Sequence, residues 1–150
     1  MLRAASLLAS FLLYFSVTAE SQAGIHVGIG KVDEIDGQGS EMAAISWETE
    51  EKYPWEFLVG TIRGRTPDPT AMPDVYFGSV SKRIYWGNFY GQFGVAMTNS
   101  DNEVLSEHWQ FQSGIGYRYN RFTLTLRHLS NGNTGGRNRG ENYLMLQYGF

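Results

Sequence analysis

Apolar and polar positions alternate along most of the chain from residue 24 onward, in segments separated by turn-forming residues. Ile25, Val27 and Ile29 form one such apolar row, and Phe122, Leu124 and Leu126 form another. Successive side chains of a β-strand point to opposite sides, so this period of two predicts strands with one apolar face. No stretch shows convincing helical periodicity. Eight segments follow the pattern, namely residues 25–30, 43–48, 55–60, 76–86, 89–98, 108–119, 121–130 and 142–150.

The connections between these segments alternate in length. Long polar connections fall at Asp33–Ser40, Arg65–Asp74, Asn99–Glu107 and Asn131–Glu141. Short ones fall at Glu51–Pro54, at Gly87-Asn88 and near Asn120. Long loops at one end and short turns at the other are typical of bacterial outer-membrane barrels. The sequence therefore predicts an all-β fold, an eight-stranded antiparallel transmembrane β-barrel of the outer-membrane type, with both termini on the periplasmic side.

A soluble barrel that encloses a small apolar ligand is the alternative architecture. Three features favour the membrane barrel. The second face of the segments is rich in Gln, Ser, Thr and Arg, which suits a polar lumen. The chain ends in Tyr148-Gly149-Phe150, which resembles the terminal signature of outer-membrane barrels, so we expect Phe150 to engage the barrel-assembly machinery. Aromatic residues also gather at segment ends, as in an interfacial girdle, at Trp47, Trp55, Trp86, Trp109, Tyr119 and Tyr148.

The first 23 residues have the pattern of a secretory signal peptide. A basic Arg3 precedes an apolar run over residues 4–17, and small residues follow. We expect cleavage after Ala19 or after Ala23, which leaves residues 24–150 as a single domain. An N-terminal membrane anchor is the alternative reading of the same run. With the barrel pattern, the signal peptide predicts export to the outer membrane of a Gram-negative bacterium.

Composition narrows the chemistry. The chain has no cysteine, which excludes disulfides, thiol nucleophiles and thiolate metal sites. The net charge of −3 gives no reason to expect nucleic acid as a partner. His26 and His108 stand alone in their segments, so we expect lumen or turn positions and no metal site. Glu48, Glu50 and Glu51 lie beside a short turn, where we expect them to be exposed to solvent.

One pair of residues points to catalysis. His128 and Ser130 lie two apart at the end of a segment, so they share a face, and this face is the apolar one. A base beside a hydroxyl is the arrangement of an activated serine nucleophile. The segment leads into a long loop, which predicts that the pair faces the outer leaflet. The pattern indicates hydrolysis of a substrate that resides in lipid.

The residues around this pair resemble the lipid A 3-O-deacylase (PagL) family. The resemblance rests on His128-Leu129-Ser130-Asn131, then Asn138-Arg139-Gly140, then an aromatic-bearing final strand. It implies a serine esterase that removes the 3-O-linked acyl chain from lipid A of lipopolysaccharide and needs no cofactor. Ser130 would be the nucleophile and His128 the general base. Asn131, Asn138 and Gly140 would position the substrate or stabilise the oxyanion.

The third catalytic position departs from the family pattern. Family members with a full triad have a glutamate where this chain has Asn142, and Glu141 lies one residue earlier. Strict alternation places Asn142 on the face of His128, so we expect Asn142 to orient the imidazole. Glu141 is the alternative if the strand begins later or contains a bulge. Arg137 and Arg139 are candidates for contacts with lipid A phosphates. Two other functions are left open, a structural or adhesive barrel and a lipid A acyltransferase.

Overall fold

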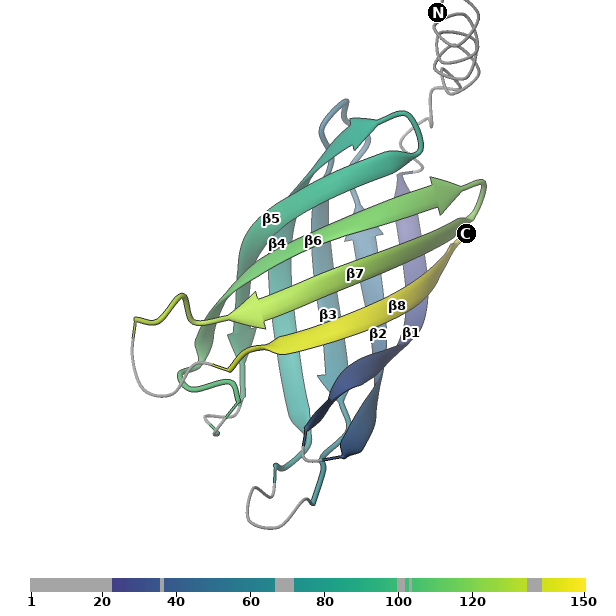
Figure 1. Ribbon diagram of the computed structural model, residues 1–150. Helices are drawn as coiled ribbons and strands as arrows, with labels where there is room; N and C mark the ends of the chain where they lie inside the picture. The colour runs from purple at the N-terminus through teal and green to yellow at the C-terminus, as the bar shows by residue number, and fades with distance from the viewer. Residues whose placement is uncertain (1–22, 36, 67–71, 100–101, 103, 135–138) are drawn as a thin grey trace, which may run out of the picture.

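The chain folds into a closed barrel of eight antiparallel strands, in which β8 pairs back with β1 (Figure 1). The computed structural model describes residues 23–35, 37–66, 72–99, 102, 104–134 and 139–150. The predicted signal peptide therefore lies almost entirely outside the described residues. The strands are β1 (Gly24–Ile35), β2 (Gln38–Glu48), β3 (Trp55–Ile62), β4 (Val75–Trp86), β5 (Phe89–Thr98), β6 (Trp109–Tyr119), β7 (Phe122–Ser130) and β8 (Glu141–Gly149). The predicted fold class is confirmed.

The two ends of the barrel differ as the connection lengths predict. Gly87 and Asn120 have φ values of +61° and +51° and lie in the tight turns that join β4 to β5 and β6 to β7. Figure 1 shows these turns, the start of β1 and the C-terminus at one end, with the longer connections at the other. In an outer-membrane barrel the short turns face the periplasm. We call the opposite end the loop end.

One predicted connection is wrong. The sequence predicts a long loop over residues 33–40, but β1 continues to Ile35 and β2 begins at Gln38. The pairing of the two strands shifts register between Val32 and Ile35. Such a bulge interrupts the alternation of inward and outward residues, so the end of β1 does not show the sequence pattern of a strand.

The outer surface of the barrel is apolar. Ile29, Phe93 and Trp109 are 70%, 62% and 62% exposed, and their neighbours on the outward face are similar in character. So large an exposed apolar surface requires an apolar solvent, and lipid supplies it. No helix among the described residues has the length and apolar character needed to cross a membrane.

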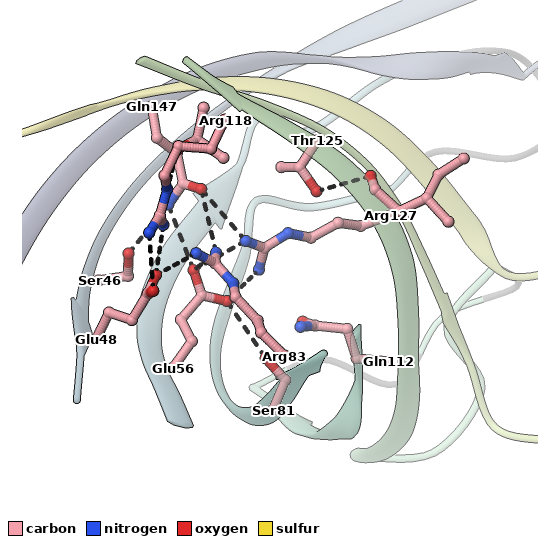
Figure 2. A network of polar contacts seen from close by, with 12 residues as sticks. Ser46, Glu48, Glu56, Ser81, Arg83, Gln112, Arg118, Thr125, Arg127 and Gln147 are labelled. Carbon is pink, nitrogen blue, oxygen red and sulfur yellow. Dashed lines mark hydrogen bonds and ion pairs between the residues drawn. The ribbon is translucent and has the colours of Figure 1, made fainter. Parts of the chain in front are cut away.

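Buried charges form a network of ion pairs and hydrogen bonds inside the barrel (Figure 2). Arg118 forms two hydrogen bonds with Glu48, at 2.6 and 2.9 Å, and Arg127 approaches Glu56 at 2.8 and 2.9 Å. Arg83 lies between the two carboxylates and pairs with both. Glu48 is 1% exposed, so the expectation that it faces solvent is wrong. It is the last residue of β2, and strand parity still turns it inward.

An apolar cluster lies in the lumen near the loop end, beside buried polar side chains such as Gln110 and the Arg65–Glu141 pair, so the predicted polar lumen is interrupted there by apolar residues. Leu105, from the connection between β5 and β6, is buried among inward-facing strand residues. These residues include Val32, Met42, Leu58, Ile62, Val75, Phe77, Leu129, Tyr143 and Met145. The barrel interior therefore holds a network of buried charges and, toward the loop end, an apolar core.

We expect Glu56→Gln to destabilise the barrel strongly, because it leaves the buried Arg83 and Arg127 without one carboxylate. Breaking a buried ion pair from one side typically costs about 3–5 kcal/mol. Glu51→Gln is the matched control, since Glu51 pairs with Lys82 at the surface and such pairs contribute about 0–1 kcal/mol. Urea titration of the folded barrel in detergent, followed by tryptophan fluorescence, measures both free energies of unfolding. Equal effects of the two variants would show that the buried pairs do not stabilise the barrel.

Candidate active site

His128 and Ser130 lie on the outer face of β7, at the loop end of the barrel. Both side chains are half-buried. The residues between and before them, Leu129 and Arg127, are buried in the lumen with exposures of 0% and 1%. These inward-facing residues fix the parity of the strand, so the imidazole and the hydroxyl both face lipid.

The imidazole of His128 is held by the neighbouring strand. Asn142 on β8 lies directly opposite His128 in the strand register. The Nδ1 atom of His128 is 2.8 Å from Oδ1 of Asn142. A carbonyl oxygen only accepts hydrogen bonds, so Nδ1 carries the proton and Nε2 keeps its lone pair. This tautomer is the one that a general base beside a serine requires.

Asn142 is itself held by a carboxylate from β1. Its Nδ2 donates to Oδ2 of Asp33 at 2.8 Å, and its backbone N–H donates to Oδ1 of Asp33 at 3.3 Å. Asp33 falls in a segment for which the sequence pattern predicts a loop, so it is not among the predicted site residues. Closure of the barrel brings β1 beside β8, and the odd-numbered positions of β1 up to Asp33 face outward there.

Glu141, the alternative orienting residue, has a different environment. Its side chain is 3% exposed on the lumen side of β8 and forms an ion pair with Arg65. Arg65 also donates from Nη1 to the backbone carbonyl of Asp33 at 2.7 Å. Of the two candidates, Asn142 is therefore the residue in contact with His128.

Gly140 lies against the free edge of the imidazole. A Cβ atom on this glycine would lie 2.5 Å from Cε1 and 3.0 Å from Nε2 of His128. Its φ of +73° is also a conformation that other residues rarely adopt. Gly140 precedes Glu141, the first residue of β8, and its N–H donates to the carbonyl of Val104 at 3.1 Å. The absence of a side chain at Gly140 thus leaves room for the Nε2 edge of the ring.

A backbone donor lies beside the hydroxyl. The N–H of Gly132 donates to Oγ of Ser130 at 3.2 Å, and Gly132 has a φ of +66°. Backbone N–H groups near a nucleophile are suited to stabilise the negative charge that develops on an ester oxygen. The sequence analysis did not single out Gly132. In the sequence, Gly132 is marked only by its place in the run of turn-forming residues that follows Ser130.

Of the remaining predicted site residues, the structure describes Asn131 and Arg139. Asn131 is 1% exposed and points inward, where Nδ2 donates to the carbonyl and the hydroxyl of Ser106 at 3.0 and 3.1 Å. Its carboxamide is therefore committed to the loop structure and is directed away from the ester site. Arg139 is exposed next to Gly140. Arg137 and Asn138 lie outside the described residues.

The other two histidines are lumen and loop residues. His26 is 2% exposed inside the barrel, and Nδ1 of His108 lies 2.8 Å from the carbonyl of Thr98. Within the part of the chain that the structure describes, no three His, Asp or Glu side chains are arranged to hold a metal ion.

These features define a class of protein. A closed barrel with an apolar outer surface carries, at its loop end, a serine and an oriented histidine that face lipid. This is the arrangement of an outer-membrane esterase whose substrate is a lipid.

The chain belongs to the lipid A 3-O-deacylase (PagL) family, whose model matches residues 43–150. Among solved structures, the crystal structure of the outer membrane enzyme PagL is similar in fold. The TM-score is 0.53 and the sequences are 14% identical, over 83% of this chain and 96% of that chain. No curated protein matches the sequence. The protein is thus an outer-membrane hydrolase of the esterase type that removes the 3-O-linked acyl chain from lipid A.

We expect Gly140→Ala to lower the deacylation rate by about 100-fold, since a displacement of about 1 Å at a reacting group can have that effect. The added methyl group would push the imidazole out of place. Gly37→Ala is the matched control, because Gly37 has a φ of +78° and no atom lies within 4 Å of the place that its methyl group would take. Both positions have a positive φ, but only at Gly140 would the new methyl group meet other atoms, namely the imidazole of His128 and, at 2.7 Å, the backbone oxygen of Leu129. A rate that falls equally in both variants would contradict an effect of these contacts. Deacylation of lipid A by the purified variants, followed by mass spectrometry, measures the rates.

Proposed function

We propose that Ser130 is the nucleophile of lipid A 3-O-deacylation, that His128 is its general base and that Asn142 orients His128. The observation that carries this assignment is the 2.8 Å contact between Nδ1 of His128 and Oδ1 of Asn142. It leaves the Nε2 lone pair for the serine proton.

The reaction follows from these roles. Oγ of Ser130 attacks the ester carbonyl carbon while Nε2 of His128 takes the hydroxyl proton. The tetrahedral intermediate collapses, the ester C–O bond breaks, and the proton passes from His128 to the departing sugar oxygen. Water, deprotonated by His128, then attacks the acyl-enzyme and releases the fatty acid and free Ser130.

Two donors are proposed for the oxyanion. The Gly132 N–H, which lies beside Oγ of Ser130, is one of them. Asn138 is the other, on the basis of the family motif. Each such donor typically changes the rate by about 10²–10³-fold.

We further propose how lipid A meets this site. Leu124, Leu126 and Leu144 are exposed on the outer face below the pair, where an acyl chain would lie. Arg139, exposed beside Gly140, and Arg137 would then meet the phosphate groups of the lipid headgroup. This arrangement lets the ester approach laterally from the outer leaflet.

The route to the membrane is also a proposal. We infer that the signal peptide is removed by cleavage after Ala19 or after Ala23, because both sites precede the start of β1 at Gly24 and lie among small residues. We also infer that Phe150 is read by the barrel-assembly machinery. Phe150 is 66% exposed, and its ring packs edge-on against Tyr148 at 5.2 Å. Such an exposed terminal aromatic group is accessible to a partner.

We expect Phe150→Ala to reduce the amount of folded barrel in cells while leaving the activity of protein refolded in detergent unchanged, because Phe150 follows the end of β8 whereas His128 lies opposite its start. Heat-modifiable migration in gel electrophoresis measures the folded fraction in isolated outer membranes. Normal assembly of the variant would remove the proposed role of Phe150.

We expect Ser130→Ala to abolish deacylation, because loss of a serine nucleophile typically lowers kcat by about 10⁶-fold. Ser113→Ala is the sharp control. Ser113 is exposed on the outer face of β6, directly opposite His128 in the strand register. We expect Ser113→Ala to retain activity. Mass spectrometry of lipid A from a Gram-negative host that expresses each variant gives the result, and the reverse outcome would make Ser113 the nucleophile.

A further inference from the structure

We propose that Asp33 is a positioning residue of this active site, which acts on His128 through Asn142. The inference rests on the proposed role of His128 as the general base. It extends the site from two strands to three, β7, β8 and β1, and assigns a role to a residue that the sequence analysis placed in a loop.

Asp33 fixes the direction of the Asn142 carboxamide. The two ends of an asparagine side chain are almost identical in shape, and one donates hydrogen bonds while the other accepts them. An ionised carboxylate only accepts, so Asp33 selects the orientation in which Nδ2 of Asn142 points toward it, at 2.8 Å. Oδ1 must then face Nδ1 of His128, as it does. The acceptor at Asp33 thereby determines which imidazole nitrogen carries the proton.

Asp33 also supplies charge. Asn142 is neutral and by itself provides no negative charge to stabilise the imidazolium that forms during the reaction. Asp33 provides this charge across one intervening amide. Hydrogen bonds polarise one another along such a chain, more strongly outside bulk water. The amide oxygen of Asn142 therefore becomes a better acceptor for His128 than an isolated amide would be.

Asp33 is itself held rigidly. Its carboxylate contacts both the side chain and the backbone N–H of Asn142. Its backbone carbonyl accepts a hydrogen bond from the buried Arg65, which is also paired with Glu141 on β8. The register shift between Val32 and Ile35 occurs at this position. The alternation of β1 is unbroken up to Asp33, so the strand itself places this carboxylate on the outer face beside the residue that orients His128.

The test compares Asp33→Ala and Asp33→Asn with the parent protein, refolded in detergent and checked for heat-modifiable migration. Glu34→Gln is the matched control, because Glu34 is the neighbouring acid and is exposed. We expect Asp33→Ala to lower kcat about 10–100-fold, the usual effect of losing a hydrogen bond to a charged group, with KM unchanged. The kcat of Asp33→Asn should lie between those of Asp33→Ala and the parent, since the new carboxamide can replace one hydrogen-bond acceptor but not the negative charge.

Rescue separates a positioning role from a merely structural one. Asn142→Glu supplies a carboxylate directly to Nδ1 of His128, so Asp33 is then no longer needed. We expect the double variant Asp33→Asn/Asn142→Glu to recover to within about 10-fold of the parent rate, and to exceed Asn142→Glu alone, in which two carboxylates would face each other.

The possible outcomes separate this inference from the proposed function. Activity that persists in Ser130→Ala would overturn the proposed nucleophile, and activity that persists in His128→Ala would overturn the general base and with it the role of Asp33. If Ser130→Ala is inactive while Asp33→Ala has the parent kcat, only the inference about Asp33 fails. A loss in Asp33→Ala that Asn142→Glu does not restore also overturns it, because Asp33 would then support the strand and not the imidazole.

Discussion

The register of β8 between β7 and β1 is the constraint on which the site depends. His128, Asn142 and Asp33 meet only because these three strands pair in one alignment. A shift by one residue would turn every outward side chain inward. Buried charges make that shift costly, since Arg127 on β7 pairs with Glu56 and Glu141 on β8 pairs with Arg65. The ion pairs inside the barrel therefore hold the lipid-facing site in alignment, although they contact no substrate.

The site is also a product of barrel closure. Asp33 belongs to the first strand, and Asn142 belongs to the last, so their contact exists only when β1 and β8 have paired. A carboxylate at position 142 could accept from His128 with no further partner. An amide has a donor end that needs an acceptor of its own, because an unpaired polar group near lipid is unfavourable. The choice of asparagine thus requires a second residue, and the closing strand provides it.

Much of this architecture could be predicted from the sequence, and the failures have physical causes. Alternation located the strands and placed Asn142 beside His128, because a period of two depends only on which face meets lipid. Asp33 was missed since a bulge interrupts that period. Asn131 is a polar residue next to Ser130, which is what a substrate-binding residue would look like in the sequence. Its hydrogen bond to Ser106 is what shows that its side chain points inward. Contacts between segments that are distant in the sequence cannot be predicted from the local alternation of apolar and polar residues.

Polar groups on the outer surface of a membrane barrel lose contact with water, which is unfavourable. The same lipid surroundings also strengthen the electrostatic interactions that a reaction there would use. Each member of the chain from Asp33 to His128 satisfies the next, which limits the penalty of placing polar groups beside lipid. The same poorly screened surroundings strengthen electrostatic interactions relative to bulk water. The site lies at the loop end of β7, where this environment meets the headgroup region. An ester bond of lipid A lies at the same boundary, with its acyl chain in the hydrocarbon and its sugar in the headgroup layer. His128, the proposed general base, lies near the end of β7 on the side of the barrel where such a bond is expected.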